Sequence, residues 1–218
     1  MEEYVIPDDI KVEESEKKRS PLWYIVAVFL VLILVLWVVP YYGFKSDPKP
    51  SNVPSLSSVL ADAPSGNYTL KLQSIGDVRS LSVSPFLKHV SSKVASSCSE
   101  VSDVCYSKAL FYFVRDNIVY VPDPKYDYIE SPEAVLLDSS SDCDGQAVLL
   151  AMLLKSVGIT PRIALTNDHS YVQVYLPDAI KFYKSEGDWV FVDPTCKSCS
   201  FGEVTFSSVK NVVSYVYV

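Results

Sequence analysis

The sequence lacks the motifs that mark nucleotide, cofactor or nucleic-acid binding. It has no glycine-rich phosphate loop and no dinucleotide fingerprint, so it predicts no cofactor. Acidic residues outnumber basic ones by 26 to 19, the formal net charge is −7, and no basic patch occurs. Because proteins bind the phosphate backbone mainly through Lys and Arg, this charge balance disfavours a nucleic-acid partner.

Histidine is scarce, with 2 residues in the chain, His89 and His169. A structural zinc site needs about four ligands, and no second close Cys or His pair accompanies Cys196 and Cys199. The sequence therefore predicts no metal, although half of a metal site at these two cysteines stays open as an alternative. His89 lies far from any motif, and we interpret it as a structural residue.

The 5 cysteines form two close pairs and one remainder. Cys98 with Cys105 and Cys196 with Cys199 are candidate disulfides if the domain is exported, and reduced core cysteines are the alternative. Cys143 is then left over. An unpaired thiol in an oxidising compartment is a candidate reactive residue.

One long hydrophobic run is present, because residues 22–39 contain no charged side chain. As a helix at about 1.5 Å per residue it would extend about 27 Å, close to the thickness of a hydrocarbon core. We therefore expect a transmembrane helix over residues 21–44. A buried soluble helix and a cleaved signal peptide are alternatives; the acidic segment before the run and the missing small-x-small site disfavour the signal peptide.

The charges flanking this run predict its orientation. Lys17, Lys18 and Arg19 precede it, whereas Lys45 and Lys49 follow it. The positive-inside rule then keeps the N-terminus cytoplasmic and the C-terminal part extracytoplasmic, in a single-pass protein of the cell membrane with the lipid bilayer as a partner.

The rest of the chain divides by composition. We expect an acidic cytoplasmic tail over residues 1–20, a Pro/Ser-rich tether over 45–60 and one domain over 61–218, long enough to bury a core. Asn67 begins an N-glycosylation sequon in that domain. Helices are expected around residues 85–97 and 102–117 and strands toward the C-terminus, which makes an α+β fold.

Cys143 stands before an apolar stretch with helical spacing, and Gly158 follows where a helix would end. Asp142 is a candidate N-cap. A cysteine is nucleophilic as its thiolate, which helix N-termini and nearby imidazolium groups favour. The sequence thus predicts that Cys143 is a nucleophile in the first helical turn.

His169 and Asp193 follow Cys143 in the order of a base and an orienting carboxylate. His169 opens the strand-like segment 169–176, and Asp193 closes a second such run over residues 189–192. Taken singly, each residue has an ordinary structural explanation, such as a turn at Asp193. Together they predict a Cys-His-Asp triad of papain-like geometry.

These blocks resemble the transglutaminase-like superfamily. Residues 142–150 and 157–162 are similar to its nucleophile block, 169–174 to its histidine block and 189–195 to its aspartate block. The resemblance covers roughly residues 84–196. It implies a papain-like core, a nucleophile helix packed on an antiparallel sheet, with Cys143, His169 and Asp193 as the catalytic residues.

The implied chemistry is acyl transfer from an amide of a protein or peptide at the cell surface. The Cys143 backbone N–H is the expected oxyanion donor, and Gln146 is a conceivable second one. The sequence leaves open whether water or an amine accepts the acyl group. A catalytically inactive member of the fold, acting as an extracytoplasmic binding or scaffold module, is the alternative, since Asp142 and Asp144 flank the thiol.

Overall fold

The structure is a computed structural model that describes residues 20–42, 47–64, 66, 71–122, 128–204 and 211–218. It divides into two compact units, Met1–Phe44 and Lys45–Val218. The predicted sequon at Asn67 and residues 1–19 of the acidic tail predicted over 1–20 lie outside the described residues.

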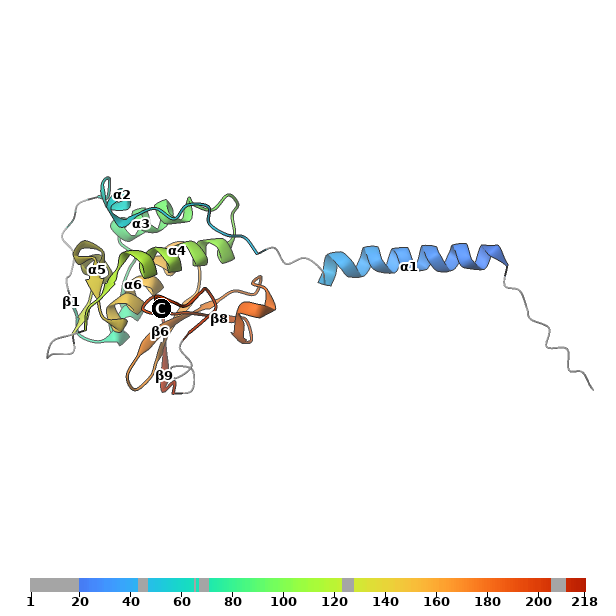
Figure 1. Ribbon diagram of the computed structural model, residues 1–218. Helices are drawn as coiled ribbons and strands as arrows, with labels where there is room; N and C mark the ends of the chain where they lie inside the picture. The colour runs from blue at the N-terminus through green and yellow to red at the C-terminus, as the bar shows by residue number, and fades with distance from the viewer. Residues whose placement is uncertain (1–19, 43–46, 65, 67–70, 123–127, 205–210) are drawn as a thin grey trace, which may run out of the picture. The chain divides into compact units, whose positions relative to one another are not determined.

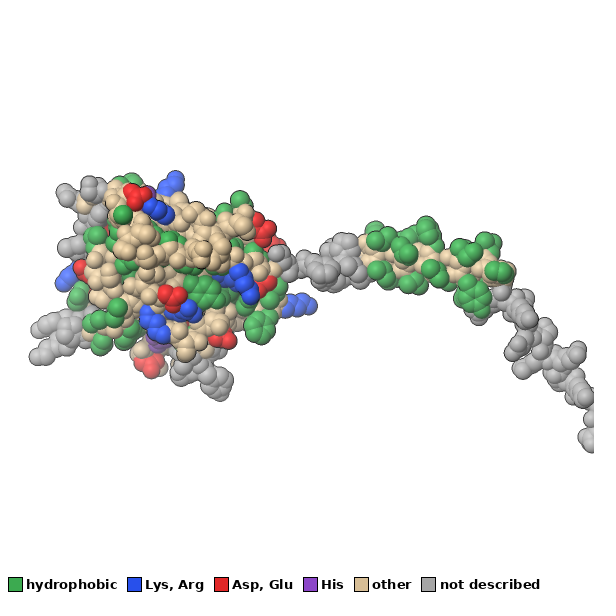
Figure 2. All heavy atoms as spheres, turned by 45° about the horizontal axis from the view of Figure 1, so that its top comes forward, with side chains coloured by type: hydrophobic (Ala, Val, Ile, Leu, Met, Phe, Trp, Pro, Cys, Tyr) green, Lys and Arg blue, Asp and Glu red, His purple; other side chains and the backbone are tan. Residues whose placement is uncertain are grey.

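The first unit contains helix α1, Pro21–Tyr42. Its side chains are described as far as Trp37, and every large apolar one from Leu22 to Trp37 is exposed (Figure 2). Among the residues that the structure describes, no helix combines the length and hydropathy needed to cross a membrane.

The second unit is an α+β domain, as predicted (Figure 1). Its helices are α2 Leu56–Leu60, η1 Ile75–Ser80, α3 Pro85–Ala95, α4 Asp103–Asn117, α5 Pro132–Asp138, α6 Cys143–Ser156 and η2 Lys181–Tyr183. Its strands are β1 Lys71–Leu72, β2 Val119–Tyr120, β3 Ile129–Glu130, β4 Ser140–Ser141, β5 Pro161–Leu165, β6 Ser170–Tyr175, β7 Lys184–Glu186, β8 Trp189–Val192 and β9 Ser214–Tyr217.

Helix α6 is the centre of the domain. All its residues from Gly145 to Leu154 are buried, as expected for a helix that is apolar on every side. It packs against α3, α4 and α5 and against strands β5 and β6. Gly158 follows with a φ of 82°, a conformation that glycine adopts without strain and that ends the helix as predicted.

The main sheet has five strands in the order β7-β8-β6-β5-β9, all antiparallel. Ile163, Val172 and Val192 form a row across three strands, in register, and all are buried. Because alternate residues of a strand share a face, this row lines the side of the sheet that packs against α6.

The helices begin at side-chain caps that the sequence supplies. Ser84 accepts from the Leu87 N–H at the start of α3, and Ser131 accepts from the Ala134 N–H at the start of α5. In both helices proline occupies the first turn, where no intrahelical N–H bond is lost. Residues 132–138 thus form a helix ahead of the nucleophile helix.

The segment predicted as a tether packs on the domain over its described part. The Asp47 carboxylate contacts the buried ammonium of Lys108, and the Ser51 N–H donates to the Ser97 carbonyl at 2.9 Å. In α2, Leu56 and Val59 join the core. Composition alone predicted a spacer because it does not reveal these long-range contacts.

Candidate active site

Cys143 is the first residue of α6 and is half-buried. Asp142 caps the helix, since its carboxylate accepts from the N–H groups of Asp144 at 3.0 Å and Gly145 at 3.1 Å. The predicted N-cap is therefore confirmed. The thiol lies at the positive end of the α6 dipole, which favours a negative charge.

Local packing fixes the turn that presents this cysteine. The Gln146 side-chain amide donates to the Ser141 carbonyl at 3.0 Å, and the Ser141 hydroxyl donates to Glu130 at 2.9 Å. A Cβ on Gly145 would lie 1.9 Å from the Ser141 Oγ, so a larger residue here would force the Ser141 side chain to move. Gln146 is fully buried, which removes it as a second oxyanion donor.

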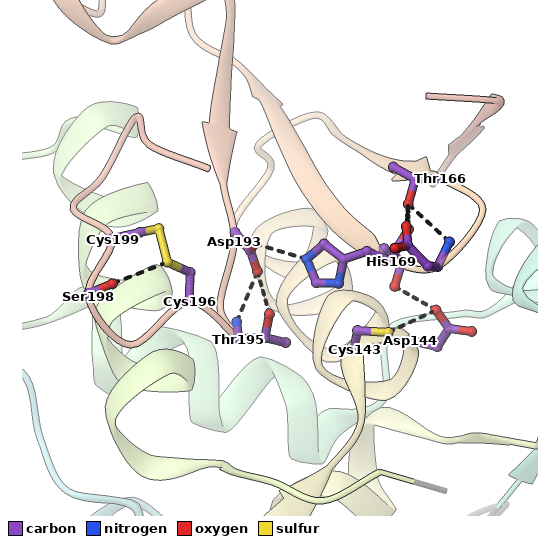
Figure 3. A network of polar contacts seen from close by, with 11 residues as sticks. Cys143, Asp144, Thr166, His169, Asp193, Thr195, Cys196, Ser198 and Cys199 are labelled. Carbon is purple, nitrogen blue, oxygen red and sulfur yellow. Dashed lines mark hydrogen bonds and ion pairs between the residues drawn. A yellow bond between two sulfur atoms is a disulfide. The ribbon is translucent and has the colours of Figure 1, made fainter. Parts of the chain in front are cut away.

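His169 lies at the end of a tight turn, immediately before β6. The N–H and hydroxyl of Thr166 donate to the His169 carbonyl at 2.8 and 2.9 Å. The ring Nε2 lies 2.9 Å from Oδ2 of Asp193, while the other ring nitrogen faces the Cys143 sulfur (Figure 3). The histidine side chain is 20% exposed.

Asp193 is the most buried member of the three, with 1% of its side chain exposed. It follows β8, which pairs with β6, so that adjacent strands bring it beside His169. Its Oδ1 accepts from the Thr195 N–H at 3.1 Å and the Thr195 hydroxyl at 2.7 Å. These bonds fix the carboxylate that orients the imidazole.

The electrostatics of the site favour a charged histidine. Burial of the ring opposes the imidazolium, but the hydrogen bonds and charges of Asp193 and Cys143 outweigh it and raise the pKa of His169 to about 10. An imidazolium of this kind beside a thiol is the partner that a nucleophilic thiolate requires.

A comparison with known families agrees with this geometry. Residues 88–194 match the model of the transglutaminase-like superfamily, and the match includes Cys143, His169 and Asp193. The chain contains a transglutaminase-like domain. No curated protein matches the sequence.

The transglutaminase-like domain places a buried aromatic ring beside its histidine. The ring of Tyr171 lies 6.3 Å from that of His169 at 28° and packs against Phe191 at 5.8 Å. Burial raises the pKa of Tyr171 to about 12, and its hydroxyl has no hydrogen-bond partner among the described residues. Tyr171 thus places a buried, uncharged ring beside the imidazole.

Both predicted disulfides are present. Cys98 is bonded to Cys105 and Cys196 to Cys199, so Cys143 is the free member of the 5 cysteines, all of which are described. The second bridge uses both sulfurs that a metal half-site would have needed. The part of the chain that the structure describes contains no group of three or more potential metal ligands.

The loop that carries the second disulfide is fastened to the end of α4. Lys197 donates to the carbonyls of Arg115 and Ile118, the latter at 2.8 Å, and Arg115 donates to the Cys199 carbonyl at 2.8 Å. Burial lowers the pKa of Lys197. The loop begins directly after Thr195, and its attachment supports the position of Asp193.

Sequence reasoning missed one contact at this site. Asp144 Oδ1 accepts from the Ser170 hydroxyl at 2.5 Å and lies 3.8 Å from the Cys143 sulfur (Figure 3). Sequence spacing alone could not have found this bond, since 26 residues separate the two partners.

Proposed function

We propose that this protein is a thiol enzyme that transfers acyl groups from protein or peptide amides. The observation that carries the proposal is the 2.9 Å contact between His169 and a carboxylate, Asp193, that is 1% exposed. A buried acceptor fixes the ring tautomer and stabilises the imidazolium, which is the role of the third residue in such triads.

The reaction has two steps. The Cys143 thiolate attacks the carbonyl carbon and forms a C–S bond, after which the C–N bond breaks and the His169 imidazolium protonates the departing amine. Water or a primary amine then attacks the thioester while neutral His169 accepts its proton. The thiolate leaves, and the imidazolium is restored.

We assign the contact with the oxyanion to the Cys143 backbone N–H. The next two amides of the turn donate to the Asp142 carboxylate, and the Gln146 N–H donates to the Asp142 carbonyl at 3.2 Å. The Cys143 amide is therefore the one at this helix start that a substrate oxygen beside the thiol would meet.

We also propose that the hydrophobic segment over residues 21–44, which continues past the last side chain that the structure describes in α1, anchors the enzyme to a cell membrane with its domain outside. The uncharged run over residues 22–39, the exposed apolar side chains of α1 and the basic residues before it support this topology. The two disulfides agree with an oxidising compartment. Protease accessibility of the domain in intact cells tests this topology, since cleavage only after permeabilisation would contradict it.

A non-catalytic binding module is the second candidate. The 3.8 Å approach of Asp144 to the thiol favours it, because a carboxylate at that distance opposes thiolate formation. The charged His169 imidazolium favours the thiolate and so offsets the effect of Asp144 on Cys143. For this reason we place the enzyme first.

Incubation with casein and a fluorescent primary amine tests the enzymatic proposal. We expect either incorporation of the amine or release of peptide or ammonia, both lost in Cys143→Ala, together with a thioester adduct of Cys143 in intact-mass spectra. Equal behaviour of the wild type and Cys143→Ala in every assay would favour the binding module.

A further inference from the structure

Two residues that the proposed reaction does not use connect its nucleophile to its base. Asp144 directly follows Cys143, and Ser170 directly follows His169. The Ser170 hydroxyl donates to Asp144 Oδ1 at 2.5 Å, and the same oxygen lies 3.8 Å from the Cys143 sulfur. This is a direct polar bond between the start of α6 and the start of β6.

Asp144 is one of several charged groups around the thiol. Among the described residues, the others are His169 before β6, Asp193 after β8, Asp142 at the start of α6 and Glu130 on β3. Asp193 accepts from His169 and Thr195. Asp142 accepts from the amides of α6, and Glu130 accepts from the Ser141 hydroxyl. Asp144 Oδ1 accepts from both the Cys143 thiol, at 3.8 Å, and the Ser170 hydroxyl.

We propose that Asp144 and Ser170 are positioning residues that set the separation of Cys143 from His169 and the pH at which the thiolate forms. The proposal rests on the proposed function, because it concerns the same thiol and imidazole. The Asp144 carboxylate disfavours the thiolate, and the bond from Ser170 withdraws part of its charge and holds it in place. The balance of these two effects therefore sets the pH at which Cys143 becomes reactive.

The two partners have opposite effects under this proposal. Asp144→Asn removes the charge but keeps an oxygen that accepts from Ser170, so Cys143 should react at lower pH. Ser170→Ala keeps the charge but removes the donor, so Cys143 should react at higher pH. The double variant should behave like Asp144→Asn, because Ser170 acts through the carboxylate.

The test measures the rate of iodoacetamide labelling of Cys143 against pH in the full-length chain purified in detergent. We expect the midpoint to fall by about 1 unit in Asp144→Asn and to rise by about half a unit in Ser170→Ala. Asp62→Asn and Ser185→Ala are matched controls. They remove an exposed carboxylate that pairs with Lys93 and an exposed hydroxyl that donates to Trp189.

The outcomes separate this inference from the proposed function. Midpoints that move in the same direction, or do not move, while labelling still depends on His169, overturn the role of the pair and leave the triad intact. Labelling that ignores His169 in every variant overturns the triad as well. A shift in Ser170→Ala that persists on the Asp144→Asn background also contradicts the pair.

Discussion

Two ion pairs in the domain bury opposite partners. In Asp193–His169 the carboxylate is 1% exposed and the imidazole 20%, whereas in Asp47–Lys108 the ammonium is 2% exposed and the carboxylate 29%. In the first pair, the ring nitrogen that does not bind Asp193 faces a thiol. In the second, the cation is enclosed by protein.

The contacts of the Lys108 ammonium are structural. Its ammonium contacts Asp47, donates to the Pro48 carbonyl at 3.2 Å and lies 4.7 Å from the centre of the Tyr183 ring. The Tyr183 hydroxyl donates to Asp47 at 3.0 Å, and burial together with that carboxylate raises the pKa of Tyr183 to about 12. A buried cation thus fastens residues 47–48 to the domain, whereas a buried anion prepares a partly exposed base.

The largest effect that this comparison predicts is on stability. Lys108→Ala leaves a cavity and unpaired polar partners, so the free energy of unfolding should fall by about 4 kcal/mol. Urea denaturation of the full-length chain measures it. Lys108→Met, which keeps most of the volume without the charge, should lose less, and neither variant should alter the pH dependence of Cys143 labelling. A loss below about 1 kcal/mol in Lys108→Ala would show that the pair is not structural.

The reactive region should be sensitive to packing at one glycine. In Gly145→Ala the new methyl group would collide with Ser141, so stability should fall by about 2 kcal/mol. Adding Ser141→Ala should restore part of the loss, as thermal unfolding can measure. If Ser141→Ala restored no stability, the collision with the Ser141 hydroxyl would not be the cause of the loss.

Removing the buried charge of Asp193 should lower the reactivity of Cys143. Asp193→Asn keeps the shape and an acceptor for Thr195 but loses the charge that stabilises the imidazolium. The rate of Cys143 alkylation at pH 6 should therefore drop by at least about tenfold. Asp47→Asn is the matched control in the other pair and should leave this rate unchanged. If the alkylation rate dropped equally in Asp193→Asn and Asp47→Asn, the Asp193–His169 pair would have no special effect on Cys143.

A further expected effect is on the pH dependence of stability. His169 has a pKa of about 10 in the folded chain and about 6.5 unfolded. A raised pKa stabilises the fold fully below about 6.5, and this contribution is lost as the pH rises toward 10. The difference in unfolding free energy between the wild type and His169→Ala should narrow across that window. A difference that stays constant would contradict the charged state of the histidine.

Sequence predicted the elements with strong local periodicity. The nucleophile helix, the strand after His169 and the strand before Asp193 are confirmed. Their apolar residues reflect burial in the core, since α6 is buried from Gly145 to Leu154, β6 from Ser170 to Val174, and β8 at alternate positions. The Asp47–Lys108 pair and the Ser170–Asp144 bond could not be predicted, because each joins residues far apart in the chain. Gly145 stood in the motif, but the collision that requires it depends on the position of Ser141.

The proposed enzyme depends on a reactive ion pair between Cys143 and His169. Iodoacetamide labelling of the full-length chain across pH, in the wild type, Cys143→Ala and His169→Ala, tests it most directly, with mass spectrometry identifying the labelled residue. We predict selective labelling of Cys143 near pH 6 that is lost in His169→Ala. Labelling only above about pH 8, unaffected by His169, would contradict the account.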